Sequence, residues 1–194
     1  MNRIKVLFYI LSIAAAWNPQ AAVSDPAKRV HSFVSDDGVR CVTFDYKAGL
    51  MVTSAHCATG KTMRLSDGRT ASVHKRRNFD EALGDYEATD RDIALLRPSE
   101  SRRPFRIDRS QTLPVGTILY LQPPTQPAIP CPLVERRGLT LILDCYASEG
   151  LSGSPIFRIG SFGSRRVVGI LSAIEPANRL SWATHISSVD WLTK

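Results

Sequence analysis

The chain has 194 residues, of which 43% are hydrophobic and 22% charged, so it can bury a core and is not a disordered segment. Its 12 glycines and 12 prolines, and the lack of any internal period, exclude collagen-like and repeat architectures. The net charge of +7 favours contact with polyanionic surfaces without requiring it.

The N-terminus has the pattern of a secretory signal. Arg3 and Lys5 precede an uncharged apolar run over residues 6–17, which is shorter than the ~20 residues that a membrane-spanning helix needs. Small residues at Ala22 and Ser24 predict cleavage before Asp25, with the earlier alanines as competing sites. We therefore expect residues 1–24 to be removed and the product to be secreted or periplasmic, with no membrane contact.

The cysteines indicate disulfide bonds. Export places Cys41, Cys57, Cys131 and Cys145 in an oxidising compartment, where an even number predicts two disulfides in one of three connectivities. Pairing in sequence order would close two short loops, each worth about 3 kcal/mol in the chain-entropy model. The alternative is a zinc site that includes Cys57 and His56, but the sequence has no CxxC or HxxxH spacing. We expect no metal and no cofactor.

Short runs of β-branched, aliphatic and aromatic residues between turns predict an all-β protein. The expected strands cover residues 40–46, 50–54, 70–75, 92–97, 117–122, 139–145, 166–173 and 180–186. Only the tail from Ser187, a suitable N-cap, is predicted to be helical. Proline, serine and arginine accumulate over residues 98–115, which we interpret as a connector between two halves of similar length.

Three segments carry residues suited to acyl transfer. His56 follows an apolar strand in TSAHC, Asp92 opens the predicted strand DIALL, and Ser152 lies between glycines in EGLSGSP. Each of these features, taken alone, more often has a structural role than a catalytic one. Together they supply a base, an acid that orients it and a nucleophile in a loop whose glycines let backbone N–H groups approach a ligand.

These segments, together with GILSA, resemble the trypsin and chymotrypsin-like serine endopeptidases, closest in style to small bacterial secreted members. The family uses the chain order His56, Asp92, Ser152, whereas α/β-hydrolases use Ser, Asp, His. The resemblance implies two six-stranded antiparallel β-barrels of the chymotrypsin type with a short C-terminal helix. The first barrel, over residues 25–104, would carry His56 and Asp92, and the second, over residues 105–194, would carry Ser152.

The resemblance also implies roles for these residues. Ser152 would be the nucleophile, His56 the general base and acid, and Asp92 its orienting partner. The backbone N–H groups of Gly150 and Ser152 would form the oxyanion hole. The family spacing pairs Cys41 with Cys57; a hairpin around the Arg136-Arg137-Gly138 turn would pair Cys131 with Cys145.

The sequence departs from the family at three positions. Leu151 stands where trypsin-like enzymes have an aspartate that binds the new N-terminus, so we expect no activating cut beyond signal removal. Tyr146 replaces the trypsin aspartate at the base of the specificity pocket, and Leu171 replaces the histidine of glutamate-specific relatives. Substrate-binding residues implied by the resemblance are Tyr146, Ser172, Ala173, Ile174 and Trp182. For Tyr146 and Trp182, ordinary core packing is an equal interpretation.

The leading hypothesis is a secreted, monomeric serine endopeptidase that cleaves polypeptide substrates through an acyl-enzyme. The alternative is a catalytically inactive, protease-like binding module whose basic surface holds a partner. We expect no nucleic-acid partner, because the basic clusters at residues 75–77, 102–103 and 165–166 have no interleaved aromatic residues on which bases would stack.

Overall fold

The computed structural model describes residues 26–77, 85–110 and 112–193. The predicted signal segment, residues 1–24, and the predicted cleavage point at Asp25 lie outside this part of the chain. None of the described helices is long and apolar enough to cross a membrane.

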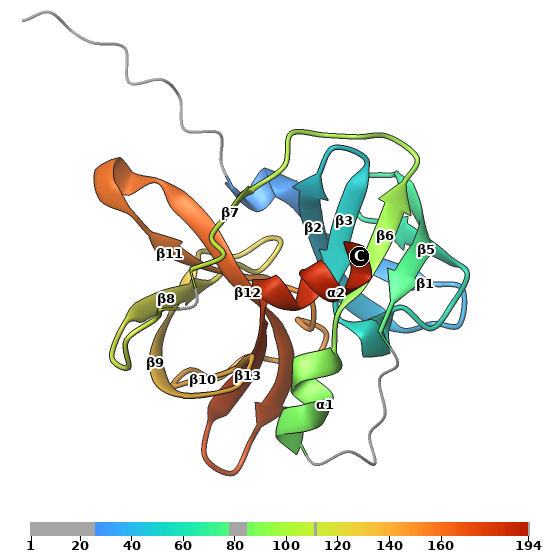
Figure 1. The fold of residues 1–194 in the computed structure, drawn as a ribbon. Coiled ribbons are helices and arrows are strands. Elements are labelled where there is room, and N and C mark those ends of the chain that lie inside the picture. The colour runs from blue at the N-terminus through green and yellow to red at the C-terminus, as the bar shows by residue number, and fades with distance from the viewer. Residues whose placement is uncertain (1–25, 78–84, 111, 194) are drawn as a thin grey trace, which may run out of the picture.

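Two β-barrels lie side by side, as the sequence predicts (Figure 1). The first begins after a 3₁₀ turn, η1 (Pro26–Arg29), and closes in the order β1-β2-β3-β6-β5-β4 through pairing of β1 with β4. Its strands are β1 (Val30–Ser35), β2 (Arg40–Lys47), β3 (Leu50–Thr53), β4 (Thr62–Leu65), β5 (Thr70–Arg76) and β6 (Ala94–Pro98).

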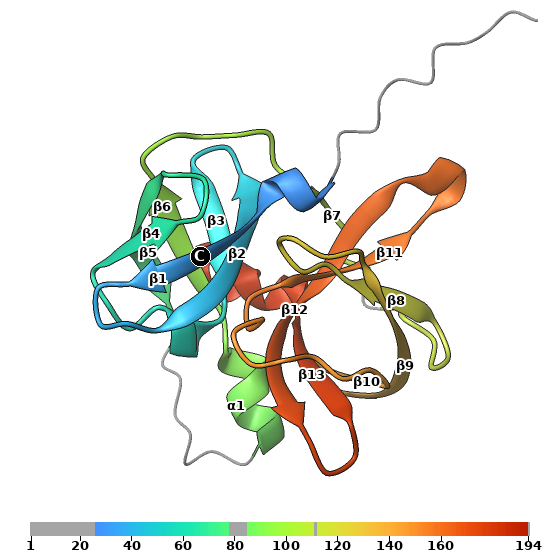
Figure 2. The same cartoon turned by 180° about the vertical axis from the view of Figure 1, so that it is seen from behind.

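The second barrel, seen from behind in Figure 2, has the order β11-β8-β9-β10-β13-β12 and closes through pairing of β11 with β12. A short strand, β7 (Arg106–Ile107), adds in parallel to β12. The predicted boundary between residues 104 and 105 lies between β6 and β7. The barrel strands are β8 (Ile118–Leu121), β9 (Ile129–Arg137), β10 (Thr140–Leu143), β11 (Pro155–Ile159), β12 (Arg165–Glu175) and β13 (Leu180–His185); a 3₁₀ turn, η3 (Ser161–Gly163), links β11 to β12.

Three apolar clusters form the core of the described part of the chain. One fills the first barrel around Met51 and Met63, and another fills the second barrel around Leu119 and Leu133. The third joins the barrels, because it combines first-barrel residues such as Phe44 with residues of β11, β12 and the C-terminal segment. Burial of this shared apolar surface fixes the relative position of the barrels and of the loops between them.

Every predicted strand overlaps an observed one, with one shift that affects a candidate residue. The strand expected at 92–97 begins at Ala94, so Asp92 ends a turn instead of opening the strand. Strands β1, β4, β7, β9 and β11 are not among the predicted ones. β9 contains Pro130 and Pro132, and β11 begins with Pro155, which are residues that weaken a strand pattern in sequence.

The expectation that only the tail is helical is wrong, because residues Asp85–Arg91 form helix α1. This helix leaves the first barrel and docks on β13 of the second (Figure 1). The Thr184 hydroxyl donates to the carbonyl oxygen of Thr89 at 2.6 Å, and the Thr140 hydroxyl donates to the Asp90 carboxylate at 2.7 Å. Tertiary contacts therefore hold a short polar helix whose sequence has no apolar stripe.

The predicted C-terminal helix is present, but its cap differs from the expected one. A 3₁₀ turn, η4 (Ile186–Val189), leads into α2 (Asp190–Thr193). The residue at the N-cap of η4 is His185, whose ring accepts a hydrogen bond from the backbone N–H of Ser187 at 3.3 Å. An imidazole nitrogen thus takes the role that we expected for the Ser187 hydroxyl.

Candidate active site

His56 lies in a 3₁₀ turn, η2 (Ala55–Cys57), that follows β3 directly. Both neighbours of His56 are buried, and a disulfide joins Cys57 to Cys41 in β2 with a Cα–Cα distance of 6.1 Å. The second predicted disulfide, Cys131–Cys145, is also present. The bridge beside His56 ties the turn to the barrel wall, and the imidazole remains partly exposed between the two barrels.

The Asp92 carboxylate is fully buried and points at His56. Its Oδ2 lies 2.8 Å from His56 Nδ1, and its Oδ1 accepts the backbone N–H of His56 at 2.9 Å. The Ser172 hydroxyl donates a further hydrogen bond to Oδ2. A buried carboxylate needs such donors, and as an acceptor it holds the histidine proton on Nδ1. The other ring nitrogen, Nε2, is then a base.

The loop that carries Ser152 is attached to both barrels. The carbonyl oxygen of Ser152 accepts the Val42 N–H at 2.8 Å, and the Gly153 N–H donates to the Leu171 carbonyl oxygen at 2.7 Å. Gly153 has φ +87°, and a Cβ there would overlap the carbonyl oxygen of Val42 and lie 2.5 Å from Thr53 Oγ1. Only glycine fits this position, because both the backbone angle and the close approach exclude a side chain.

Ser152 and His56 line the same cavity, which has a volume of about 290 Å³. The Ser152 hydroxyl donates to the carbonyl oxygen of Ser172 at 3.3 Å. A serine hydroxyl rotates freely, and catalytic hydrogen bonds commonly tighten only when substrate is bound. The structure therefore gathers the predicted base, acid and nucleophile at one site, with Asp92 behind His56 and Ser152 beside it.

Gly150 lines the same cavity. Gly150 has φ +81° in a turn that the Leu151 N–H closes onto the Ser148 carbonyl oxygen at 3.4 Å. Gly150 takes the third position of this four-residue turn, where a positive φ favours glycine. No described residue accepts a hydrogen bond from the amide of Gly150 or Ser152.

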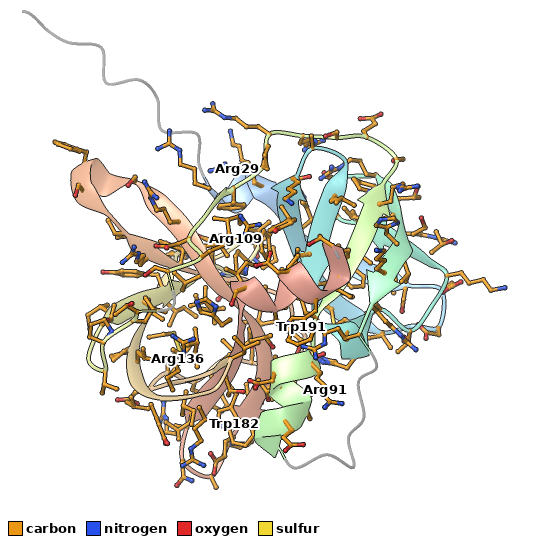
Figure 3. All side chains as sticks on the ribbon, in the orientation of Figure 1. Arg29, Arg91, Arg109, Arg136, Trp182 and Trp191 are labelled. Atoms are coloured by element: carbon orange, nitrogen blue, oxygen red, sulfur yellow. A yellow bond between two sulfur atoms is a disulfide. The ribbon has the colours of Figure 1, made fainter. Side chains whose placement is uncertain are left out.

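The predicted substrate-binding residues fall into two groups. Ser172, Ala173 and Ile174 line the cavity. Tyr146 and Trp182 are not among its lining residues. Tyr146 is 47% exposed and lies under the Arg179 guanidinium at 5.9 Å from its ring centroid. Trp182 lies on β13 opposite Ala173, on the second barrel near α1 in Figure 3.

Sequence reasoning missed several other residues of the cavity wall. They come from the start of β2 and from the turn before Gly150: Val39, Arg40, Ser148 and Glu149. Their positions next to Cys41 and Gly150 are the only signal in the sequence that would place them in this wall. Leu171, which stands where glutamate-specific relatives have a histidine, also lines the cavity. Two of these residues, Arg40 and Glu149, bring opposite charges to the cavity.

The zinc interpretation does not fit the donor atoms. Cys41, His56 and Cys57 offer atoms within 4.8 Å of one another, but the two sulfurs form the disulfide. Thiolates are the cysteine form that binds zinc, and a disulfide supplies none.

Comparison with known proteins identifies the fold. No protein-family model and no curated sequence matches this chain. Among solved structures it is similar to a serine protease of a human pathogenic astrovirus, at 15% identity and a TM-score of 0.59 over 82% of this chain and 90% of that one. It is also similar to the inactive form of the Rv3671c protease of M. tuberculosis, at 17% identity and a TM-score of 0.62 over 85% of this chain and 87% of that one. A Glu endopeptidase in complex with MPD aligns at 12% identity and a TM-score of 0.60 over 87% of this chain and 90% of that one. The fold is therefore chymotrypsin-like.

Proposed function

We propose that this protein is a serine endopeptidase that hydrolyses polypeptide substrates through an acyl-enzyme at Ser152. The observation that carries the proposal is the buried Asp92 carboxylate, which is bonded to His56 Nδ1 while His56 and Ser152 share one cavity. A buried carboxylate paired with histidine next to a serine is the arrangement that activates a hydroxyl for nucleophilic attack. The fold, which is shared with three proteases, adds support.

The geometry supports a two-step reaction. Ser152 Oγ attacks the substrate carbonyl carbon while His56 Nε2 takes the hydroxyl proton, and the N–H groups of Gly150 and Ser152 stabilise the oxyanion. His56 then gives the proton to the leaving amine as the C–N bond breaks. Water attacks the acyl-enzyme in the second step with His56 again as base. Asp92 stabilises the imidazolium throughout.

Packing supports an oxyanion loop that forms without an N-terminal ion pair. Leu151 is half-buried and contacts both the inter-barrel cluster and the core of the second barrel. Trypsin-like activation would bring an ammonium group to this place, where leucine offers no carboxylate to offset the loss of hydration. We infer that apolar contacts of Leu151 replace the ion pair.

We further propose that the protein is exported, secreted or periplasmic, after removal of residues 1–24. The two disulfides support a location outside the cytoplasm, where thiols are oxidised. We propose that the mature protein acts as a monomer, because each described element of the candidate site comes from this one chain.

The alternative, an inactive binding module, has one observation in its favour. Arg106, Arg158 and Arg166 line a cavity of about 670 Å³ on the second barrel. This basic hollow would suit an acidic partner. Turnover separates the two hypotheses, because a binding module would retain its partner and hydrolyse nothing.

The test is cleavage of a peptide library by the mature chain and by two variants, Ser152→Ala and His56→Ala. We expect wild-type cleavage at defined bonds and a loss of kcat of about 10⁵-fold or more in both variants, since nucleophile and base act as one unit. Ser161→Ala, at an exposed serine in the β11–β12 connection, is the matched control and should keep wild-type kcat. Cleavage by Ser152→Ala near the wild-type rate would falsify the assignment.

A further inference from the structure

A second cavity, of about 340 Å³, opens beside the first, and the two share Arg40, Cys41 and Gly150. Since Gly150 is the proposed oxyanion donor, the second cavity begins next to the bond that would be cleaved. Its remaining walls come from the first barrel, from β1 and from β4 and the turn after it. They are Ser32, Phe33, Val34, Arg64, Leu65 and Ser66.

The position of this second cavity assigns it to the leaving-group side of the substrate. The residues proposed to hold the acyl side, Ser172–Ile174, lie on β12 of the second barrel. The second cavity lies on the first barrel, beyond Gly150 and the Cys41 bridge. An extended substrate that runs along β12 to Ser152 therefore continues into it. This step rests on the proposed endopeptidase function.

Three side chains form a row across the outer surface there. Val34 in β1 pairs with Arg40 in β2 on one side and with Arg64 in β4 on the other. Directly opposed residues in antiparallel strands point to the same face, with Cβ atoms about 5 Å apart. Val34 is 42% exposed, so the row presents an apolar centre between two guanidinium groups.

Neither arginine of this row is engaged in an ion pair within the described part of the chain. Arg40 and Arg64 are both exposed, and neither forms an ion pair with a described carboxylate. No aspartate or glutamate lines the second cavity. Glu149 lines the first cavity together with Arg40, on the side of the nucleophile. Like charges on one face cost stability, whereas a carboxylate placed between two guanidinium groups would bond to both.

We propose that Arg40, Val34 and Arg64 form a subsite that binds an acidic side chain of the substrate, located within about three residues after the cleaved bond. The length of the substrate segment matches the width of the row, because an extended peptide rises about 3.3 Å per residue and neighbouring strands lie about 4.8 Å apart. Three residues of substrate therefore span the same length as the row. Arg40, which also lines the first cavity, approaches this side chain from the side of the cleaved bond, and Arg64 approaches it from the far side of Val34.

The test uses peptide pairs that differ only by Glu or Gln at one of the first three positions after the cleaved bond. We expect kcat/KM to be about tenfold higher for the Glu peptide at the preferred position, and the ratio to fall with added salt. Arg40→Gln and Arg64→Gln should each lower the ratio about threefold, and the double variant should bring it near one. Arg64→Glu should favour a Lys peptide instead. Arg103→Gln, at an exposed arginine of the segment between β6 and β7 that lines none of these cavities, should leave the ratio unchanged.

A binding measurement separates this inference from the proposed function. Fluorescence anisotropy with Ser152→Ala compares a labelled peptide of alternating Ala and Glu with its Ala and Gln counterpart, and needs no turnover. Tighter binding of the Glu peptide that disappears in Arg40→Gln and Arg64→Gln supports the subsite, even if a fluorophosphonate fails to label Ser152 and the endopeptidase proposal falls. Labelling of Ser152 together with equal cleavage of both peptides, or a Glu preference that survives the double variant, overturns the subsite and leaves the endopeptidase proposal standing.

Discussion

Asp92 shows how single residues build the candidate site. Its carboxylate is buried at the junction of the two barrels and accepts hydrogen bonds from His56 Nδ1, from the His56 backbone and from the Ser172 hydroxyl. The preceding helix, α1, is bonded to the second barrel through Thr89 and Asp90. The position of Asp92 therefore depends on both barrels.

Asp92→Asn should lower kcat about 10³- to 10⁴-fold. The carboxamide places an N–H donor near the imidazole, which favours the tautomer with its proton on Nε2, and that nitrogen is then unable to act as a base. Steady-state kinetics on a cleaved peptide measure the loss. Asp144→Asn, at an exposed carboxylate outside the cavity, is the control and should keep wild-type kcat. Equal kcat in the two variants would show that Asp92 does not orient the base.

His185 provides a prediction about pH and stability. The side chain is fully buried, and burial together with the nearby Arg136 charge lowers its pKa to about 4. In the unfolded chain the pKa of histidine is about 6.5, so below that pH the unfolded state binds a proton that the folded state does not. The contribution of neutral His185 to the free energy of unfolding is therefore complete above about pH 6.5. It is lost as the pH falls toward 4, by up to about 3 kcal/mol.

Urea unfolding at pH 7 and pH 4.5 measures this contribution. Between pH 7 and pH 4.5 the free energy of unfolding of the wild type should fall by about 2–3 kcal/mol more than that of His185→Asn. The difference arises because the variant has no titrating group at position 185. Comparison of the two proteins removes the contribution of carboxylates, which they share. An identical loss in both would contradict the assignment of the titration to His185.

The loop of Ser152 is the element on which the site depends most. Gly153 and Gly116 share φ +87°, but a Cβ at Gly153 would meet Val42 and Thr53, whereas a Cβ at Gly116 would have no neighbour within 4 Å. Gly116→Ala should therefore cost about 1 kcal/mol, from the backbone angle alone. Gly153→Ala should cost several times more or displace the loop, with loss of activity.

Thermal unfolding and peptide cleavage of both variants test this prediction. If Gly153→Ala were as stable and as active as Gly116→Ala, the result would contradict the close approach of Gly153 to Val42 and Thr53.

We also expect the Ser152 loop to reach its reactive conformation without a contact from the N-terminus. Leu151 packs against two core clusters, so the oxyanion turn should form without an α-ammonium group. A mature chain with several extra residues ahead of Asp25 should react with a fluorophosphonate as fast as a chain that begins at Asp25. A large gain only after trimming would mean that the N-terminus engages the site and that Leu151 does not replace the ion pair.

Elements differ in how well the sequence predicts them. Strands β10 and β12 carry short apolar runs between turn residues, and β2 is rich in β-branched and aromatic residues, which are patterns that favour a buried strand. Helix α1 has no such pattern, since contacts with β13 and β10 stabilise it and these neighbours are distant in sequence. Strand β4 has only four residues with alternating burial, which is too short to stand out from a turn.

At the scale of the whole molecule, the candidate site exists only because the two barrels are fixed against each other. His56 and Asp92 come from the first barrel and Ser152 from the second, and the shared apolar cluster around Phe44, Phe157 and Ile170 holds them together. The candidate residues His56, Asp92 and Ser152 could be singled out from the sequence because their residue types, their flanking residues and their chain order are local signals. Arg40 and Glu149 could not be, because their place in the cavity wall depends on how the barrels dock.

The most direct test of the central claim is intact mass spectrometry of the mature protein after reaction with a fluorophosphonate. Only a hydroxyl activated by a neighbouring base and facing an oxyanion hole reacts readily with such a reagent. We predict one adduct per chain, mapped to Ser152 by peptide sequencing, and no adduct in Ser152→Ala or His56→Ala. An unmodified wild-type protein, or an adduct on another residue that persists in Ser152→Ala, would contradict the assignment of Ser152 as an activated nucleophile.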